Sequence, residues 1–497
     1  MFLFSISACK KDDHKINFTF IQLNDVYEIA PIQAGKYGGM ARVETIHKEL
    51  LAENKNTMLL MAGDFLNPSL LGTIKVDGER VRGKQMVEVM NAMNFDLAVF
   101  GNHEFDLSQK DLQKRLNEST FPWMSANVKL KTSEAAIPFY KEINGKKENV
   151  HESYIKEFID DDGTKIKVGF ISVCIPSNPK EYVEYGNMYV KARASYTAIK
   201  DSVDIVFGLT HVKVANDKRI SEIIPEIPLI MGGHEHTNMN VKTKNGVITK
   251  ADANAKTIYI HQIEFDKKTK KININSELKE INSSIKSDKH VSEIVNKWQN
   301  ILKTKIKDVI PNPDEVIYNA KTPLDGRDTP IRSKPTNLGK IITESMAYAY
   351  DYKLDCALVN GGSIRIDDQL RGKITPVDIF RVLPYGGDIL KVKLKGSLLQ
   401  RVLNYGVSAR GTGAYLHRFN VDKIGEKWYI NKKELVADKV YTVAFSDYLL
   451  KGFDIPFLSA KNKEVISIYK PEVTTLASDI RKAVVAYLKE QNKKSAK

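Results

Sequence analysis

The chain has 497 residues, of which 42% are hydrophobic and 27% are charged, and its formal net charge is +14 at pH 7. This length exceeds one ordinary domain, so two or three are expected, and the composition is typical of a globular rather than a disordered protein. No apolar run approaches the ~18–20 residues of a membrane span, and the spread-out lysines form no RNP, zinc-finger or basic-helix motif. The charge predicts a solvated basic surface, and attraction of phosphorylated substrates is the functional alternative.

The first residues, "MFLFSISACKKDD", form a short apolar tract that ends in Ser7-Ala8-Cys9 and is followed by charged residues. This tract resembles the end of a bacterial lipoprotein signal, in which the cysteine is lipidated, although the charged segment that normally precedes it is missing. We therefore expect residues 1–15 to be a signal remnant. A lipid on Cys9 would then be the only membrane attachment, at a periplasmic or cell-surface location. The alternative is a frayed cytoplasmic N-terminus.

From Ile16 to about residue 280, strand-like runs alternate with helical stretches. The runs are apolar on both faces and include "FTFIQL", "TMLLMAG", "DLAVFG", "KVGFISV", "DIVFGLT" and "IPLIMGG". Each is followed by a turn rich in Gly, Asn, Asp or His. This pattern predicts a layered α/β domain with its functional residues at strand ends.

A long helix is expected over residues 287–310, because apolar residues recur there at helical spacing before Pro311 ends the segment. They are Val291, Ile294, Trp298, Ile301 and Ile306. A second patterned block, with strands such as "CALVNGG" and "ILKVKLKG", begins near residue 325. We expect a first domain over 16–285, a linker with this helix over 286–324, and a second domain over 325–490.

Five strand-end turns of the first block concentrate side chains that bind metals. They contain Asp25, then Asp64 in "AGDFLNPS", Asn102, His103 and Asp106 in "GNHEFD", His211 in "LTH", and His234 and His236 in "GGHEH". Each turn alone is a weak signal, but four of the ten histidines fall at such ends. Imidazoles with carboxylates and an amide oxygen suit Zn, Mn, Fe or Co, whereas Mg²⁺ or Ca²⁺ sites would not require so many imidazoles.

The order of these turns resembles the calcineurin-like metallophosphoesterases. The resemblance implies two divalent metal ions bridged by Asp64, with a hydroxide between the ions as the nucleophile. It assigns Asp25 and His236 to the first ion, and Asn102, His211 and His234 to the second. His103 would bind no metal but face the scissile phosphoester, and Asp106 would orient its ring.

The second block resembles the C-terminal domain of the 5'-nucleotidase family, in "TNLGKIITESMAYAY", "ALVNGGSIR", "VLPYGGDIL" and "DYLLKGFD". The resemblance implies an α/β protein in which a four-layer α/β/β/α metallophosphoesterase domain precedes a smaller α+β domain that binds the nucleoside. Tyr385 and Tyr448 stand where the family usually has phenylalanines that sandwich the base. Asp454 matches an acid that contacts the ribose, and Arg332, Asn360 and Arg365 match positions that hold the base, ribose or phosphate.

The sequence departs from the family at its first motif, which is normally Asp-x-His and here reads Asp25-Val26-Tyr27. One interpretation is that Tyr27 ligates the first metal as a phenolate, which would favour a hard ion such as Fe³⁺. The other is that Tyr27 only lines the site. This second interpretation is chemically simpler, because the phenol does not have to lose its proton.

The sequence thus predicts an extracytoplasmic 5'-nucleotidase that acts on nucleotides and not on nucleic acids; it does not predict an oligomeric state. The enzymatic alternatives on the same scaffold are a 2',3'-cyclic-nucleotide phosphodiesterase/3'-nucleotidase and a UDP-sugar hydrolase. The non-enzymatic alternative is a lipid-anchored nucleotide-binding protein with an impaired metal site.

Overall fold

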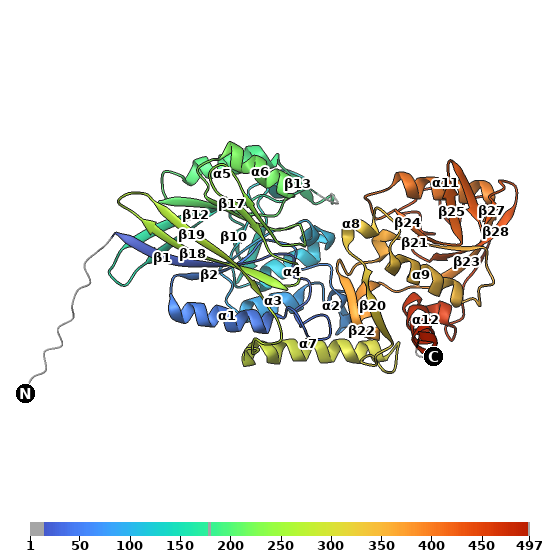
Figure 1. The fold of residues 1–497 in the computed structure, drawn as a ribbon. Helices are drawn as coiled ribbons and strands as arrows, with labels where there is room; N and C mark the ends of the chain where they lie inside the picture. Colours follow the sequence, from blue (N-terminus) through green and yellow to red (C-terminus); the bar gives the residue numbers. More distant parts are fainter. Residues whose placement is uncertain (1–13, 177–179, 496–497) are drawn as a thin grey trace, which may run out of the picture. The chain divides into compact units, whose positions relative to one another are not determined.

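The computed structural model describes residues 14–176 and 180–495, and it divides into two compact units, Met1–Asn300 and Ile301–Lys497 (Figure 1). Cys9, the expected site of lipid attachment, lies outside the described residues. Cys174 and Cys356 are buried free thiols. None of the described helices is long and apolar enough to cross a membrane.

Unit 1 is built on two six-stranded sheets. The first has the order β19-β18-β1-β2-β5-β6, in which β1, β2, β5 and β6 are parallel and β18 is antiparallel to β1. Its strands are β1 (Lys15–Leu23), β2 (Thr57–Met61), β5 (Leu97–Val99), β6 (Trp123–Met124), β18 (Thr257–Asp266) and β19 (Ile272–Glu280). The second sheet has the order β11-β12-β14-β15-β17-β16, with β12, β14, β15 and β17 parallel. Its strands are β11 (Ser153–Ile159), β12 (Lys165–Ile171), β14 (Ile205–Thr210), β15 (Leu229–Gly232), β16 (Met239–Lys242) and β17 (Val247–Lys250).

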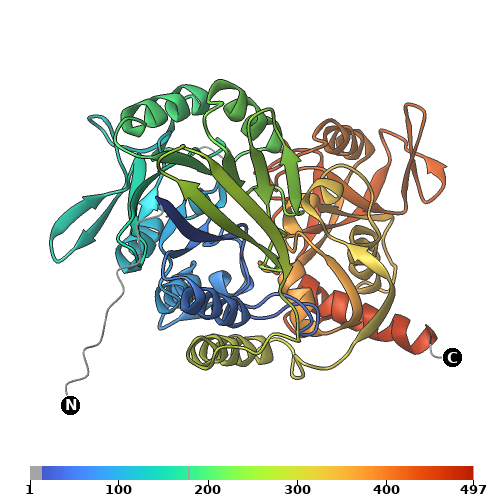
Figure 2. The same ribbon diagram turned by 60° about the vertical axis from the view of Figure 1, so that its left-hand side comes forward.

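The core of unit 1 lies between these sheets. Phe18 and Phe20 of the first sheet pack against Phe158, Phe170 and Phe207 of the second, with ring centroids 5.2–6.4 Å apart. Helices α1 (Met40–Glu53) and α3 (Lys84–Ala92) cover the outer face of the first sheet, and α5 (Met188–Ile199) and α6 (Val214–Ile223) cover the second (Figures 1 and 2). Strands such as β2 are therefore buried on both faces, as their unbroken apolar sequence predicts. The expected α/β/β/α layering is confirmed.

Shorter elements complete unit 1. They are α2 (Leu70–Thr73), α4 (Gln109–Glu118), the 3-10 turn η1 (His103–Asp106), and the strands β3 (Lys75–Val76), β4 (Glu79–Arg80), β7 (Val128–Lys131), β8 (Ala136–Ile137), β9 (Tyr140–Ile143), β10 (Lys146–Asn149) and β13 (Val183–Tyr185).

Helix α7 (Lys289–Lys307) contains the boundary between the two units. It begins after Asp288, whose carboxylate accepts a hydrogen bond from the backbone N–H of Val291 (3.0 Å), as an N-cap should. Its buried stripe is Val291, Val295, Trp298, Leu302 and Ile306. The sequence predicted the helix, but two of the apolar residues that recur at helical spacing, Ile294 and Ile301, are only half-buried. Neighbouring apolar positions on a helix differ by about 100° in direction, so composition alone does not choose between them.

Unit 2 is a mixed α and β unit around a five-stranded sheet with the order β24-β21-β28-β23-β29. Helix α11 (Gly396–Ser408) packs on one face of this sheet, where Leu398, Val402, Leu358, Val392 and Phe445 share a core. Helix α9 (Asn337–Tyr348) contacts β21 and β24, and it also contacts α12 (Ile480–Ser495). The strands are β20 (Tyr318–Asp325), β21 (Cys356–Asn360), β22 (Gln369–Ile374), β23 (Ile389–Lys395), β24 (Leu416–Phe419), β25 (Val421–Ile424), β26 (Lys427–Ile430), β27 (Lys433–Glu434), β28 (Val440–Ser446) and β29 (Val465–Tyr469). The remaining helices are α8 (Asp328–Ile331), α10 (Pro376–Val382), η2 (Gly361–Ser363) and η3 (Leu476–Ser478).

Candidate metal centre

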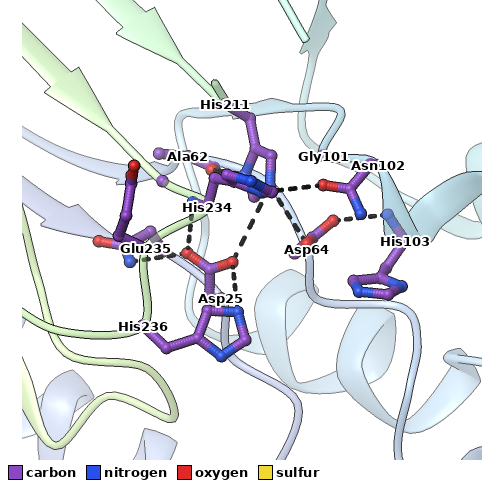
Figure 3. Close-up of polar contacts among 12 residues, drawn as sticks. Asp25, Ala62, Asp64, Gly101, Asn102, His103, His211, His234, Glu235 and His236 are labelled. Carbon is purple, nitrogen blue, oxygen red and sulfur yellow. Dashed lines mark hydrogen bonds and ion pairs between the residues drawn. The ribbon is translucent and has the colours of Figure 1, made fainter. Parts of the chain in front are cut away.

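The eight candidate residues of unit 1 follow the carboxyl ends of five strands. Asp25 follows β1, Asp64 follows β2, the segment from Asn102 to Asp106 follows β5, His211 follows β14, and His234 and His236 follow β15. Because these strands are parallel neighbours within each sheet, their ends meet at one edge, and the turns face one another there (Figure 3).

Six of these residues bring nitrogen and oxygen donors to one place. Asp25 Oδ1 lies 3.2 Å from His236 Nε2 and 3.9 Å from His211 Nε2. Asp64 Oδ2 lies 3.1 Å from the same His211 nitrogen. On the other side, His234 Nδ1 is 3.2 Å from Asn102 Oδ1. Asp25, Asp64 and His211 are fully buried, and their ligand atoms lie within 4.8 Å of one another, as a shared metal site requires.

The hydrogen bonding of His211 shows why this cluster fits a cation. Its Nδ1 lies 2.7 Å from the carbonyl oxygen of Ala62, which can only accept, so Nδ1 carries the proton and donates. In the neutral ring, the lone pair of Nε2 then faces the oxygens of Asp25 and Asp64. Within the described residues, His211 Nε2 and Asp25 Oδ1 are buried atoms without a hydrogen-bond partner. Acceptors that face one another in a buried site require positive charge between them, and the donor set suits a divalent metal.

The buried carboxylates and imidazoles of this cluster shift one another's pKa. Burial by itself would raise the pKa of Asp25, but His236 and His211 outweigh burial and hold that pKa well below its usual range. Burial would lower the pKa of His211, but Asp64 and Asp25 raise it to about 9. Without a metal ion the protonated ring therefore supplies the positive charge between the carboxylates, and a bound cation would replace that proton. Burial and the neighbouring His211 lower the pKa of His234 to about 3, so His234 is neutral, which is the form that binds metals. The carboxylates therefore stay ionised in a buried site.

The backbone of this site is strained where the ligands stand. Asp25, Asp64 and His234 have φ values of 54°, 57° and 86°, in the left-handed region that side chains other than Asn, Asp and Gly rarely adopt. At two neighbouring positions only glycine fits, because a Cβ atom would collide with nearby atoms. A Cβ on Gly101 would lie 2.1 Å from Asp64 Oδ1, and one on Gly233 would lie 2.3 Å from the carbonyl oxygen of Ala62. These approaches account for the "GN" and "GG" of the two motifs.

Sequence reasoning missed Glu104, which holds two of the turns together. This buried carboxylate accepts hydrogen bonds from the backbone N–H groups of Gly101 (2.7 Å), Asp64 (2.9 Å), Phe65 (2.8 Å) and Leu66 (3.0 Å). Burial and the nearby Asp64 raise the pKa of Glu104 to about 7. The one available signal was its place in "GNHEFD", beside the residues that were recognised.

Lys250 was also missed, although it lies beneath the histidine turns. Its fully buried Nζ donates to the carbonyl oxygens of Val212 (2.5 Å) and Gly233 (2.7 Å). It also lies 2.9 Å from Asp217 Oδ2 and pairs with the carboxylate of Glu235. The ammonium group of Lys250 thus links two turns. One is the turn after β14, which carries His211, and the other is the turn after β15, which carries His234 and His236. No local motif predicts such a contact, because Lys250 stands at the end of another strand.

We expect Lys250→Met to lower the free energy of unfolding by about 3–5 kcal/mol, because Asp217 and Glu235 would lose their buried partner. Urea unfolding followed by fluorescence measures this change. Lys297→Met is the matched control, since Lys297 forms an exposed ion pair with Glu88 (2.6 Å), and its loss should cost about 1 kcal/mol or less. Equal unfolding curves for the two variants would contradict the role given to Lys250.

His103 lies beside the cluster of ligand donors. Its backbone N–H donates to Asp64 Oδ1 (2.7 Å), while its ring Nδ1 lies 2.6 Å from Asp106 Oδ2. A carboxylate cannot donate, so Nδ1 carries the proton. The same Asp106 oxygen accepts from Asn67 Nδ2 (3.0 Å), which fixes the carboxylate that orients the ring. Tyr27 is also here, with its hydroxyl 3.1 Å from His236 Nε2.

In unit 2, the structure joins several of the predicted nucleoside-binding residues. Asp454 accepts hydrogen bonds from Asn360 Nδ2 (2.7 Å) and from the hydroxyl of Tyr448 (3.0 Å). Burial and the charge of Asp454 raise the pKa of Tyr448 to about 12, so this hydroxyl stays a donor. Tyr385 is 53% exposed and Tyr448 is 36% exposed, so neither is a core residue.

The two arginines lie in different surroundings. Arg365 is close enough to Tyr448 for its charge to oppose the rise in that pKa. Arg332 pairs with Asp328 through Nε (2.8 Å), at the end of α8. Phe453, which the sequence did not single out, is 72% exposed, and its ring centroid lies 5.9 Å from that of Tyr448.

Two parts of the chain match known family models. The family model described as calcineurin-like phosphoesterase matches residues 18–238, and the one described as 5'-nucleotidase, C-terminal domain, matches residues 316–460. The 5'-nucleotidase of Homo sapiens is 27% identical over 415 residues, which cover 76% of this chain and 68% of that protein. A trifunctional nucleotide phosphoesterase protein of Bacillus subtilis is 28% identical over 76% of this chain and 27% of its own length. The fold matches the crystal structure of a 5'-nucleotidase precursor from Thermus thermophilus with a TM-score of 0.71, at 22% identity and over 96% and 97% of the two chains.

Proposed function

The chain belongs to the 5'-nucleotidase family and is a phosphoric monoester hydrolase, and from this premise we propose that it releases phosphate from nucleoside 5'-monophosphates at the residues described above. The observation that carries the proposal is the buried cluster in which Asp25, Asp64 and His211 direct ligand atoms at one another without a hydrogen-bonded partner for His211 Nε2. Such a cluster is costly to bury unless it holds cations. A protein that only bound nucleosides would not need it.

Enzymes of the calcineurin-like type use a dinuclear divalent metal centre. We propose that Asp25, Asp64 and His236 hold one ion in this chain. The second ion would be held by Asn102, His211, His234 and the shared Asp64. Bound divalent ions would supply an activated water for in-line attack and would neutralise the phosphoryl oxygens.

The protein's own groups have separate tasks in this proposal. Glu104 and Lys250 hold the turns so that the ligands keep their geometry. His103, held by Asp106 through Nδ1–H, presents its other ring nitrogen as a donor to the oxygens on which charge develops at phosphorus or on the leaving group. The Asp106 carboxylate also favours the charged imidazole, which is the form that donates.

We propose that residues 325–490 bind the nucleoside and that residues 16–285 carry out the hydrolysis, with 286–324 as the linker. Within residues 325–490, Tyr385 and Tyr448 stack on the base, and Asp454 accepts hydrogen bonds from the ribose hydroxyls. Asn360 and Tyr448 hold Asp454 in place for this task. Arg332 and Arg365 bring planar, paired donors suited to phosphate or base.

Tyr448→Ala is expected to raise KM for AMP by roughly 5- to 150-fold and to change kcat little, because stacking of a base on a ring contributes about 1–3 kcal/mol. Tyr448→Phe keeps the ring and should stay within about threefold of the wild type, because the base-stacking surface is retained. Tyr352→Ala, which removes a half-exposed tyrosine of the same unit, is the control. Steady-state kinetics with AMP measure all three, and an unchanged KM in Tyr448→Ala would remove Tyr448 from the nucleoside site.

The substrate is tested by phosphate release from AMP, UDP-glucose and 2',3'-cyclic AMP under the same conditions. The B. subtilis relative named a trifunctional nucleotide phosphoesterase is the reason to include phosphodiester substrates. We expect the highest kcat/KM with AMP. Turnover of UDP-glucose or the cyclic nucleotide in its place would assign the chain to one of the alternatives, and nucleotide binding without turnover would make it a binding protein.

We also propose an extracytoplasmic location, with attachment through a lipid on Cys9. The apolar tract that ends at Cys9 supports this location.

A further inference from the structure

Tyr27 is the point at which this chain differs from the Asp-x-His motif of its family, and its side chain is buried beside the candidate ligands. It is 5% exposed. The side-chain oxygen of Asn254 accepts hydrogen bonds from the backbone N–H groups of Tyr27 (3.0 Å) and Glu28 (3.1 Å). The backbone N–H of Asn254 in turn donates to the carbonyl oxygen of Asp25 (2.9 Å). The turn that carries both Asp25 and Tyr27 is therefore fixed.

The Tyr27 hydroxyl stands among the donors proposed for the first ion. Its oxygen lies 3.1 Å from His236 Nε2 and 3.4 Å from Asp64 Oδ2, and His236 Nε2 lies 3.2 Å from Asp25 Oδ1. Ligands at ~2.0–2.1 Å from one metal ion in a tetrahedral site are separated by ~3.3–3.4 Å. These three separations, 3.1–3.4 Å, are close to the spacing of neighbouring donors in one coordination shell.

The 3.1 Å between the Tyr27 hydroxyl and His236 Nε2 is an ordinary hydrogen-bond length, but the contact with Asp64 is too long for a strong hydrogen bond. A hydroxyl that donates to a carboxylate oxygen usually lies ~2.5–2.7 Å from it. The separation of 3.4 Å between Tyr27 and Asp64 Oδ2 is much longer. A cation between the two oxygens would satisfy both of them at this distance.

We propose that Tyr27 is a ligand of the first metal ion, with its phenolic oxygen in the place of the family's imidazole. This inference rests on the ligand assignment of the proposed function. When the metal–oxygen bond forms, the O–H bond of the phenol breaks and its proton passes to solvent. The first site then has three oxygen donors, from Asp25, Asp64 and Tyr27, and one nitrogen donor, from His236. Such an oxygen-rich site prefers harder ions than an Asp-x-His site does. Its affinity for Fe³⁺ and Mn²⁺ relative to its affinity for Zn²⁺ should therefore be higher.

The test compares the wild type with Tyr27→Phe, which removes the oxygen, and Tyr27→His, which restores the family's residue. Each protein is stripped with a chelator and titrated with Mn²⁺ by calorimetry, and a second portion is loaded with Fe³⁺ and examined by visible absorption. Tyr259→Phe is the matched control, because Tyr259 is a buried tyrosine of the same unit whose hydroxyl donates to the carbonyl oxygen of Met239 (3.1 Å).

We expect the wild type and Tyr259→Phe to bind two Mn²⁺ and to show a phenolate-to-iron absorption band. Tyr27→Phe should lack the band and lose at least ~10-fold in Mn²⁺ affinity at one of its two sites. Tyr27→His should bind two ions without the band, and it keeps the test valid if Tyr27→Phe does not fold. A wild-type iron form without the band, or unchanged affinities in Tyr27→Phe, would overturn the inference while leaving the proposed function standing. A wild type that binds no metal would overturn both.

Discussion

Phosphate release from AMP is expected to fall by more than about a thousandfold when Asp64 is replaced by asparagine. In the proposed centre Asp64 is the residue shared by both ions, and its two oxygens have different partners. Oδ2 faces His211 Nε2, whereas Oδ1 accepts from the backbone of His103. The amide is neutral and has only one oxygen, so it cannot serve both ions as the carboxylate would. Loss of metal-supported catalysis amounts to several kcal/mol of barrier, and each ~1.4 kcal/mol is tenfold in rate.

The Asp64→Asn protein should still fold, because Asn has the same size as Asp and tolerates the left-handed backbone of this position, where φ is 57°. The measurements are kcat/KM for AMP and the number of metal ions per chain. Asp204→Asn is the control and should keep both values, because Asp204 is a half-buried residue of the same unit that pairs with Lys270 outside the candidate centre. Near-normal turnover in Asp64→Asn would remove this residue from the centre.

Replacement of His103 by alanine is expected to lower kcat by about 10²–10⁴-fold and to leave the metal content unchanged. The two effects separate because the His103 side chain contacts Asp106, whereas its link to Asp64 is made by the backbone N–H, which alanine retains. This variant therefore differs from Asp64→Asn in its metal content.

The control for His103→Ala is His290→Ala, which removes an exposed histidine at the start of α7 and should not change kcat. A His103→Ala protein that turns over normally would show that this imidazole takes no part in the chemistry. One that loses its metal would make His103 a structural residue of the centre.

The structure brings the predicted residues of the candidate centre together because they are tied to strand ends. Asp25, Asp64 and His211 each follow an apolar run, and parallel strands bring such positions together without any further information. The layered fold followed from the same runs. The predicted roles of these side chains stay open to the tests above.

Other features could not be read from the chain, because they depend on contacts between distant segments. In the sequence, Lys250 and Glu104 look like ordinary charged residues. Only the folded structure shows that each forms hydrogen bonds with backbone groups of two different turns. The bond between Tyr448 and Asp454 joins residues of one short motif, but its geometry depends on the turn after β28. The position of the Tyr27 hydroxyl among the candidate ligands could likewise not be predicted from the sequence. Both interpretations of Tyr27, as a ligand and as a residue that only lines the site, therefore remained open.

The most direct test of the account is phosphate release from AMP by the wild-type protein before and after its metals are removed. The chelator-treated protein should release no phosphate, and activity should return as Mn²⁺, Zn²⁺, Co²⁺ or Mg²⁺ is added back, reaching its maximum at two ions per chain. Undiminished phosphate release by the metal-free protein would contradict the account.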